Sequence, residues 1–141
     1  MEAITWDHVR SLANDLSSLI RKSECRPNLI VAVARGGFIP ARLLSDGIGV
    51  KKLSSIGITY TDSSRSRREV YTTPSPLGAG DSVLLVEDAL ESGRSLAEAR
   101  DILADKGATV WTAALYYRFD SVVKPDFSLG ALDKIPSFPW E

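Results

Sequence analysis

The sequence predicts an α/β fold, in which a mainly parallel sheet is flanked by helices and followed by a short irregular C-terminal tail. Two short apolar runs, Leu29–Ala34 and Ser82–Val86, contain several β-branched residues and are typical of strands buried on both faces. Each run is followed by a glycine-containing turn and then by a helical pattern. Strands that alternate with helices favour a parallel sheet, and ligands bind such sheets beyond the carboxyl ends of the strands.

Length and composition are those of one globular domain, which we expect to span residues 1–141. The chain is 44% hydrophobic and 25% charged, and a domain of this size buries most of a core without disulfides or metals. Its single cysteine, Cys25, allows neither an internal disulfide nor a cysteine-based zinc cluster. The longest apolar run is far shorter than the roughly 20 residues of a membrane span, and no signal peptide is visible. We therefore expect a cytoplasmic protein without a membrane anchor.

The charge is close to balanced overall but is divided unevenly along the chain. A net charge of −1 argues against a general nucleic-acid binder, because phosphate contacts need a basic surplus. Residues 1–70 hold 11 Lys and Arg against 7 Asp and Glu, whereas residues 71–141 hold 6 against 11. This division suggests a ligand with anionic groups together with hydroxyls or a metal ion that carboxylates can hold.

The first half of the chain is predicted to form two helices and three strands. Apolar residues recur three and four positions apart between Val9 and Ile20, and Thr5 can cap the first turn of that helix. A polar, arginine-rich stretch after the second strand indicates a mobile loop. In chain order the elements are a helix at Ile4–Lys22, a strand at Leu29–Ala34, a helix at Pro40–Gly47, a strand at Leu53–Tyr60, the loop Thr61–Arg68 and a returning strand at Glu69–Thr73.

The second half is predicted to contain two strands, one helix and the irregular tail. Prolines and glycines mark Pro74–Asp81 as turns. The helix has apolar residues on one face and Gly107 as its stop signal. In chain order the elements are a strand at Ser82–Val86, a helix at Ser95–Lys106, a strand at Ala108–Tyr116, and a tail at Arg118–Glu141 with one or two short extended pieces.

The segment after the strand at Ser82–Val86 predicts a site for a sugar phosphate. Ser92–Ser95 opens a helix, where backbone N–H groups and roughly half a positive charge favour an anion, and Gly93 permits a close backbone approach. Glu87 and Asp88, at the end of the strand, would repel a phosphate but suit sugar hydroxyls or a magnesium ion. The same residues are also compatible with a solvated strand end and an ordinary helix start.

The turn after the first buried strand has a similar layout. Ala34–Gly37 joins an apolar strand to a helix, and Arg35 takes the place of the carboxylates, so this turn favours a second anion. On its own, a Gly-Gly turn after a strand is more often only a tight turn. Together, the two turns fit a sugar phosphate and a separate polyphosphate.

These residues resemble a known family. Val83–Ser95 resembles the 5-phosphoribosyl-1-pyrophosphate (PRPP) signature of type I phosphoribosyltransferases, and Ala34–Arg42 resembles their pyrophosphate loop. Order and spacing are most similar to the small 6-oxopurine enzymes, the xanthine–guanine and hypoxanthine–guanine phosphoribosyltransferases. The similarity extends from Thr5 to the closing residues Phe138–Glu141.

The resemblance implies an enzyme of purine salvage with PRPP and a purine base as its substrates. It would transfer the phosphoribosyl group to guanine, xanthine or hypoxanthine, release pyrophosphate and require Mg²⁺. It also implies a homodimer or homotetramer, and a mobile lid at Tyr60–Arg68 that closes over PRPP.

The resemblance further implies a set of site residues. Glu91 would handle the proton of the purine ring, and Arg35 would stabilise the departing pyrophosphate. The implied set is Glu91 and Arg35 for catalysis; Glu87, Asp88, Ala89, Leu90, Glu91, Ser92, Gly93, Arg94 and Ser95 for the ribose and 5-phosphate; Arg35, Gly36 and Arg68 for pyrophosphate; Arg118, Ile135 and Trp140 for the base; and Glu87 and Asp88 for the metal.

Two other functions fit parts of the pattern. Glu91 and Ile135 stand where the oxopurine enzymes usually carry an Asp and an aromatic residue, so a non-catalytic PRPP- or nucleotide-sensing regulator with the same fold is the main alternative. An acidic pair at a strand end also occurs in phosphoacceptor signalling domains. There it normally ends the first strand, whereas Glu87 and Asp88 lie past the middle of this chain.

Overall fold

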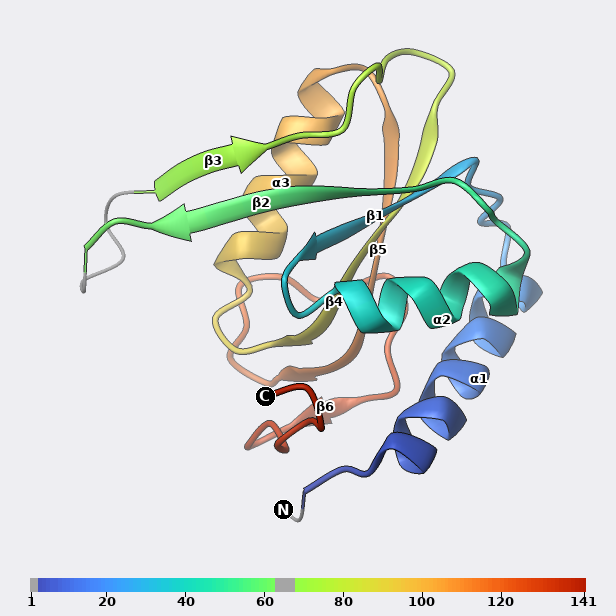
Figure 1. Cartoon of the computed structure of the whole chain (residues 1–141), viewed down its shortest axis with the longest axis vertical. Coiled ribbons are helices and arrows are strands. Elements are labelled where there is room, and N and C mark those ends of the chain that lie inside the picture. Colours follow the sequence, from blue (N-terminus) through green and yellow to red (C-terminus); the bar gives the residue numbers. More distant parts are fainter. Residues whose placement is uncertain (1–2, 63–67) are drawn as a thin grey trace.

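The computed structural model describes residues 3–62 and 68–141 and contains one six-stranded sheet with three helices against it (Figure 1). The strand order across the sheet is β3-β2-β1-β4-β5-β6. The elements are α1 (Trp6–Lys22), β1 (Leu29–Ala34), α2 (Phe38–Ile48), β2 (Leu53–Tyr60), β3 (Arg68–Thr72), β4 (Ser82–Leu90), α3 (Arg94–Asp105), β5 (Thr109–Arg118) and β6 (Ala131–Leu132).

The sheet is parallel except for the pairing of β2 with β3. β1 lies between β2 and β4, and β5 lies between β4 and β6, with parallel register throughout. The carboxyl ends of β1 and β4 are therefore neighbours at one edge, with residue Ala32 opposite Val86. The predicted fold class, a mainly parallel sheet flanked by helices, is confirmed.

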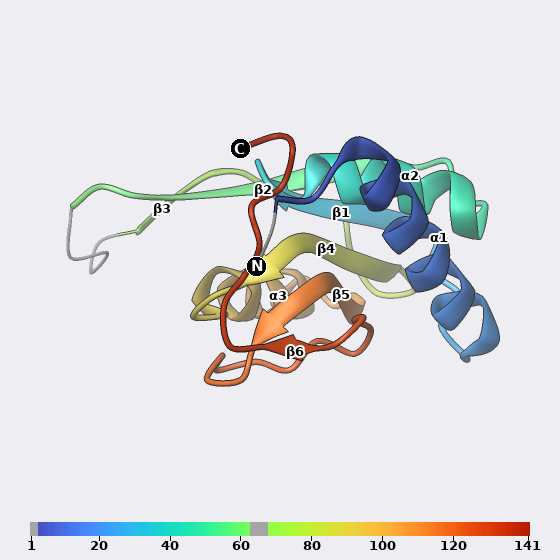
Figure 2. The same ribbon diagram turned by 90° about the horizontal axis from the view of Figure 1, so that it is seen from below.

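Alternate residues of the central strands pack into two separate cores. Ile30 and Leu84 face α1 and α2, whereas Val31 and Val83 face α3 on the other side of the sheet. Figure 2 shows α1 and α2 covering one face and α3 the other. Because both faces are covered, every residue of these strands needs an apolar side chain, which explains the continuous apolar runs in the sequence.

The helices begin and end close to their predicted positions for identifiable reasons. The Thr5 hydroxyl accepts a hydrogen bond from the His8 amide at 3.1 Å and caps α1. α2 begins at Phe38, two residues before the predicted start, because a proline such as Pro40 is tolerated in the first helical turn. α2 ends at Ile48 and is followed by Gly49, whose φ of 74° lies in the left-handed region.

The predicted end of the strand at Val86 is wrong, because β4 continues to Leu90. Glu87, Ala89 and Leu90 pair with β5, so their backbone groups are held in the sheet rather than in a loop. Glu87 and Asp88 therefore lie inside a strand and not at its end. β5 likewise continues to Arg118, which was predicted to begin the tail.

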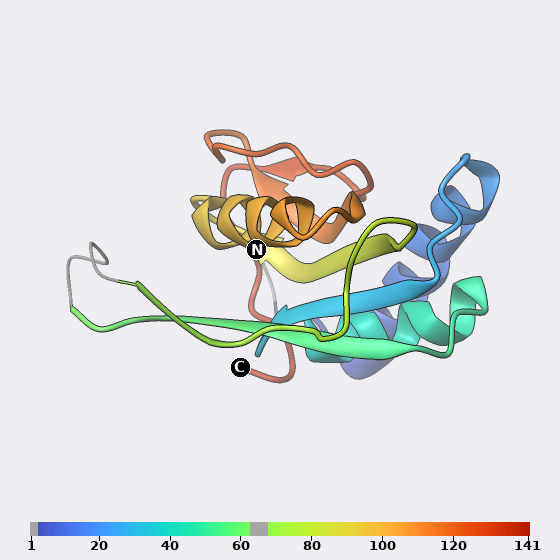
Figure 3. The same ribbon diagram turned by 90° about the horizontal axis from the view of Figure 1, so that it is seen from above.

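β2 and β3 form a two-stranded arm that projects beyond the rest of the sheet (Figure 3). The predicted strand at Glu69–Thr73 is confirmed as β3, one residue earlier at each end. Of the predicted lid at Tyr60–Arg68, residues 63–67 lie outside the described residues. Tyr60, the last residue of β2, pairs with Arg68, the first residue of β3, at the projecting end of the arm.

The tail is mostly irregular, as predicted, and returns across the carboxyl edge of the sheet. β6 and an isolated bridge between Ala113 and Phe127 are its extended pieces. The last residues then pass the ends of β4 and β1 (Figure 2), where the Ile4 amide donates to the Ser137 carbonyl at 2.9 Å. No helix within residues 3–62 and 68–141 is long and apolar enough to cross a membrane.

Cys25 is buried behind α1, with 2% of its surface exposed. Burial, with a smaller contribution from Asp126, raises the pKa of its thiol to about 11. We expect the folded protein to resist thiol-specific reagents at pH 8 and the urea-unfolded protein to react fully, which a colorimetric thiol assay measures. The unfolded thiol ionises first, so the free energy of unfolding should fall as pH rises from about 9 to 11. A thiol that reacts rapidly in the folded state would contradict this burial.

Candidate active site

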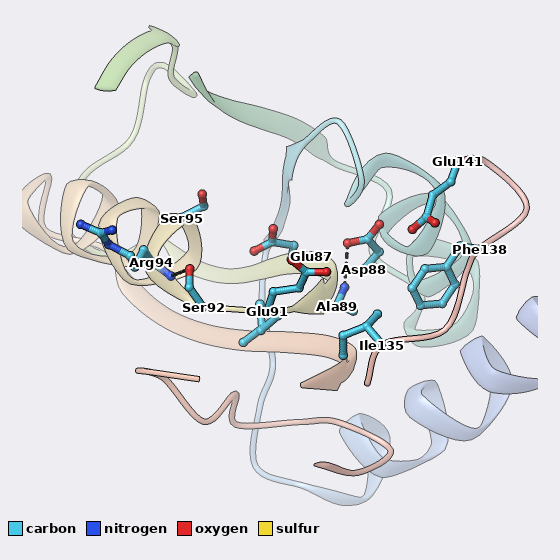
Figure 4. A pocket seen from close by; sticks show the side chains of 12 residues that line it. Glu87, Asp88, Ala89, Glu91, Ser92, Arg94, Ser95, Ile135, Phe138 and Glu141 are labelled. Atoms are coloured by element: carbon cyan, nitrogen blue, oxygen red, sulfur yellow. Dashed lines mark hydrogen bonds between the residues drawn. The ribbon is translucent and has the colours of Figure 1, made fainter. Parts of the chain in front are cut away.

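Two cavities adjoin at the carboxyl edge of the sheet, beyond β1 and β4. The first, of about 210 Å³, is lined by residues 87–95 together with Ile135, Phe138 and Glu141 (Figure 4). The second, of about 460 Å³, is lined by Arg35, Gly36, Ile39, Asp88, Trp140 and Glu141. Asp88 and Glu141 line both cavities, so the two predicted anion-binding turns serve one continuous site.

Residues 91–95, which lead into α3 and are predicted from the sequence to bind the 5-phosphate, form a tight backbone turn that we call the phosphate loop. Gly93 precedes the helix with a φ of 81°, and a Cβ atom there would lie 2.2 Å from the Ser121 hydroxyl. The Val122 amide donates to the Ser92 carbonyl at 2.8 Å, so the segment after β5 supports the loop from behind. Gly93, as the N-cap, provides no side-chain cap, and the Ser92 hydroxyl accepts the Arg94 amide at 3.3 Å. The start of a helix favours an anion, because its first N–H groups have no partner within the helix.

Two hydrogen bonds hold the carboxylate of Asp88. Its Oδ1 accepts a hydrogen bond from the Ala89 amide at 2.7 Å, and its Oδ2 accepts one from the indole N–H of Trp140 at 3.0 Å. Burial raises the pKa of Asp88 above its ordinary value and nearby Glu141 adds to the rise, whereas both hydrogen bonds oppose it. The carboxylate is thus held in place between the two cavities.

The turn after β1 packs closely against β4. A Cβ atom on Gly36 would lie 2.5 Å from the Asp88 carboxylate, and one on Gly37 would lie 2.3 Å from the Val86 carbonyl oxygen. The peptide bond between Ala34 and Arg35 is cis. These contacts explain why two glycines follow Arg35, since any side chain there would push the turn away from β4.

The structure brings together only part of the base-binding set that the resemblance implies. Ile135 lines the first cavity and Trp140 lines the second. Arg118 lines neither, because it ends β5 and its Nε lies 3.2 Å from the Asp120 carboxylate. The role of Arg118 in base recognition stays a prediction.

Arg68 is likewise separated from the other residues predicted to bind pyrophosphate. Arg35 and Gly36 line the second cavity, whereas Arg68 lies at the start of β3 and pairs with Glu98 of α3, 3.1 Å from its carboxylate. One turn earlier on α3, the Ser95 hydroxyl lies 3.2 Å from the Tyr60 hydroxyl. Both strands of the arm, at its projecting end, therefore contact α3.

Three residues that line the cavities were not predicted from the sequence: Ile39, Phe138 and Glu141. Phe138 and Glu141 belong to the closing run of the chain, whose aromatic residues in an otherwise irregular tail were the available signal. Ile39 lies in the first turn of α2, where local patterning does not separate a site residue from a core residue.

Comparisons with known proteins agree with the geometry. The family model described as "Phosphoribosyl transferase domain" matches residues 4–141. A curated xanthine-guanine phosphoribosyltransferase from Gluconobacter oxydans is 30% identical over 103 residues, which are 71% of this chain and 61% of the relative. One from Vibrio atlanticus is 29% identical over 99 residues, which are 70% and 63%. The matched region thus spans about three fifths of these curated relatives.

Solved structures show the same fold over nearly the whole chain. A crystal structure of a purine phosphoribosyltransferase from Pyrococcus horikoshii has a TM-score of 0.89 and 27% identity, and the match covers 99% of this chain and 92% of that one. A xanthine-guanine-hypoxanthine phosphoribosyltransferase from Helicobacter pylori has a TM-score of 0.87 and 21% identity, covering 99% and 93%.

Proposed function

The chain belongs to the phosphoribosyl transferase domain family, and from this premise we propose that it transfers the phosphoribosyl group of PRPP to a 6-oxopurine base and releases pyrophosphate. The observation that carries the proposal is the pair of adjoining cavities, one against the phosphate loop and one against Arg35, with Asp88 between them. The names of the curated relatives support a purine as the acceptor.

In the proposed reaction, a bond forms between C1 of the ribose and a ring nitrogen of the base, and the bond from C1 to pyrophosphate breaks. The phosphate loop would hold the 5-phosphate, and Glu87 and Asp88 would accept hydrogen bonds from the ribose hydroxyls. The Arg35 guanidinium would stabilise the negative charge of the leaving pyrophosphate. The Glu91 carboxylate, which lines the first cavity, would accept the proton that the base loses.

The donor set of the site fits a magnesium ion carried in with the substrate. Glu87, Asp88, Glu91 and Glu141 line the first cavity, so a phosphorylated ligand needs a compensating cation there. Within the described part of the chain no three His, Cys, Asp or Glu side chains form a metal site, and Mg²⁺ commonly takes one or two carboxylates plus phosphate oxygens and water. When bound, Mg²⁺ would neutralise charge on pyrophosphate.

A steady-state assay with PRPP, Mg²⁺ and a panel of bases tests the proposal. We expect pyrophosphate release with guanine, xanthine or hypoxanthine, and loss of release when EDTA removes Mg²⁺. Absence of turnover with all three bases would refute the oxopurine activity. Tight binding of PRPP or a nucleotide without turnover would instead favour the sensing regulator. The homodimer or homotetramer and the cytoplasmic location stay predictions from the sequence.

A further inference from the structure

The indole of Trp140 contacts the reaction site through Asp88. Its N–H donates to Asp88 Oδ2 at 3.0 Å, across 52 residues of sequence. We propose that Trp140 is a positioning residue, which orients the Asp88 carboxylate toward the ribose hydroxyls, and not a platform for the purine base. This inference rests on the proposed function, because it concerns how the same site holds PRPP.

The indole ring of Trp140 is held in place by two other aromatic side chains. It stacks on Phe138 with ring centroids 4.8 Å apart and planes only 4° apart, so Phe138 covers one of its two faces. The ring of Trp6, at the start of α1, lies on the indole with a centroid-to-centroid distance of 6.0 Å. Phe138 is itself 3% exposed. The N–H group therefore has a defined direction, which a donor on a freely rotating tail would lack.

Asp88 depends on this donor for its orientation. Oδ1 already accepts the Ala89 amide at 2.7 Å, and Oδ2 accepts the Trp140 indole. Each carboxylate oxygen has a second acceptor position, so two substrate hydroxyls can still bind. Gly36 lies directly against the same carboxylate and admits no side chain. Without the indole N–H, Oδ2 loses a fixed donor and the carboxylate can rotate toward either cavity.

If Trp140 instead contacts the base, the effect of its substitution should depend differently on the residue at position 88. A residue that acts through Asp88 has no effect on binding once Asp88 no longer presents two acceptor oxygens. A residue that touches the base has the same effect whether or not position 88 is an aspartate. A double-mutant cycle on PRPP binding, with no base present, separates the two roles.

The experiment measures the Kd for PRPP with Mg²⁺ by titration calorimetry in four proteins: wild type, Trp140→Phe, Asp88→Asn and the double variant. Trp140→Phe keeps an aromatic ring on Phe138 and removes only the donor, so we expect roughly tenfold weaker binding. In the Asp88→Asn background the same change should alter the Kd by less than about twofold. Trp111→Phe, on β5 against Phe127, is the matched control and should bind as wild type.

Equal losses in both backgrounds, or no loss in either, would overturn the proposal. Thermal unfolding of each variant checks that the fold is intact, and an NMR spectrum of the indole N–H groups gives a second measurement. The resonance missing in Trp140→Phe should shift in Asp88→Asn; an unshifted resonance also overturns the proposal. A wild-type chain that does not bind PRPP overturns the proposed function instead, and the NMR result alone then decides whether Trp140 orients Asp88.

Discussion

Asp88→Asn is expected to lower kcat/KM for PRPP by about 100-fold. Hydrogen bonds that involve a charged group contribute about 1.5 to 3 kcal/mol each, and in the proposed function this carboxylate accepts bonds from the ribose hydroxyls. Asparagine keeps the shape but turns one acceptor into a donor. Since both oxygens already accept N–H groups, from Ala89 and Trp140, the amide must oppose one of them. Steady-state kinetics with PRPP as the varied substrate measure the loss.

Asp101→Asn is the matched control for this variant. Asp101 lies on the exposed side of α3, with 72% of its side chain accessible, and forms a surface ion pair with Arg100 at 3.7 Å. The same chemical change there should leave kcat/KM within about twofold of wild type, because exposed ion pairs contribute little. An Asp88→Asn enzyme with full activity would show that this carboxylate does not hold the substrate.

Gly37→Ala is expected to destabilise the fold by about 2 to 3 kcal/mol, through overpacking against a backbone that cannot move aside. The added methyl group would lie 2.3 Å from the Val86 carbonyl oxygen and 2.8 Å from that of Val33. The turn must therefore move away from β4, which also displaces Arg35 from the second cavity. Thermal unfolding should show a midpoint lower by about 5 to 10 °C, and turnover should fall in the folded fraction as well.

Gly78→Ala provides the comparison for the glycine variant. A Cβ atom on Gly78 would meet only the Lys106 carbonyl oxygen, at 3.8 Å, which is ordinary contact. Replacement by alanine there should leave the unfolding midpoint unchanged or raise it slightly, because it restricts the unfolded chain. Equal destabilisation by the two variants would mean that the packing of the turn after β1 is not the cause.

The fold class was predictable because the sequence features that mark its helices, strands and turns lie within a few residues of one another. The apolar runs of β1 and β4, the Thr5 cap and the glycine turns each report a feature that neighbouring residues determine. The ends of β4 and β5 escaped prediction because residues 87–90 are held by pairing between two strands distant in sequence. A segment with two adjacent carboxylates has no strand pattern of its own. It becomes a strand because its backbone pairs with β5.

The candidate site also has parts that were predictable from the sequence and parts that were not. The phosphate loop and the turn with Arg35 were visible as motifs, because binding an anion with backbone groups requires a particular order of small residues after a strand. The ion pairs of Arg68 with Glu98 and Arg118 with Asp120 were not visible. A sequence shows that an arginine is present, but not which carboxylate it meets.

By itself, the sequence determined the α/β class, the positions of the two turns predicted to bind anions, and the family resemblance, since each depends on residues a few positions apart. Only the tertiary structure decided that the two turns serve adjoining cavities and that the tail returns to close them. It also decided that the indole of Trp140 reaches Asp88. These contacts join segments far apart along the chain, and the parallel sheet, held between two apolar cores, is what brings their ends to one edge.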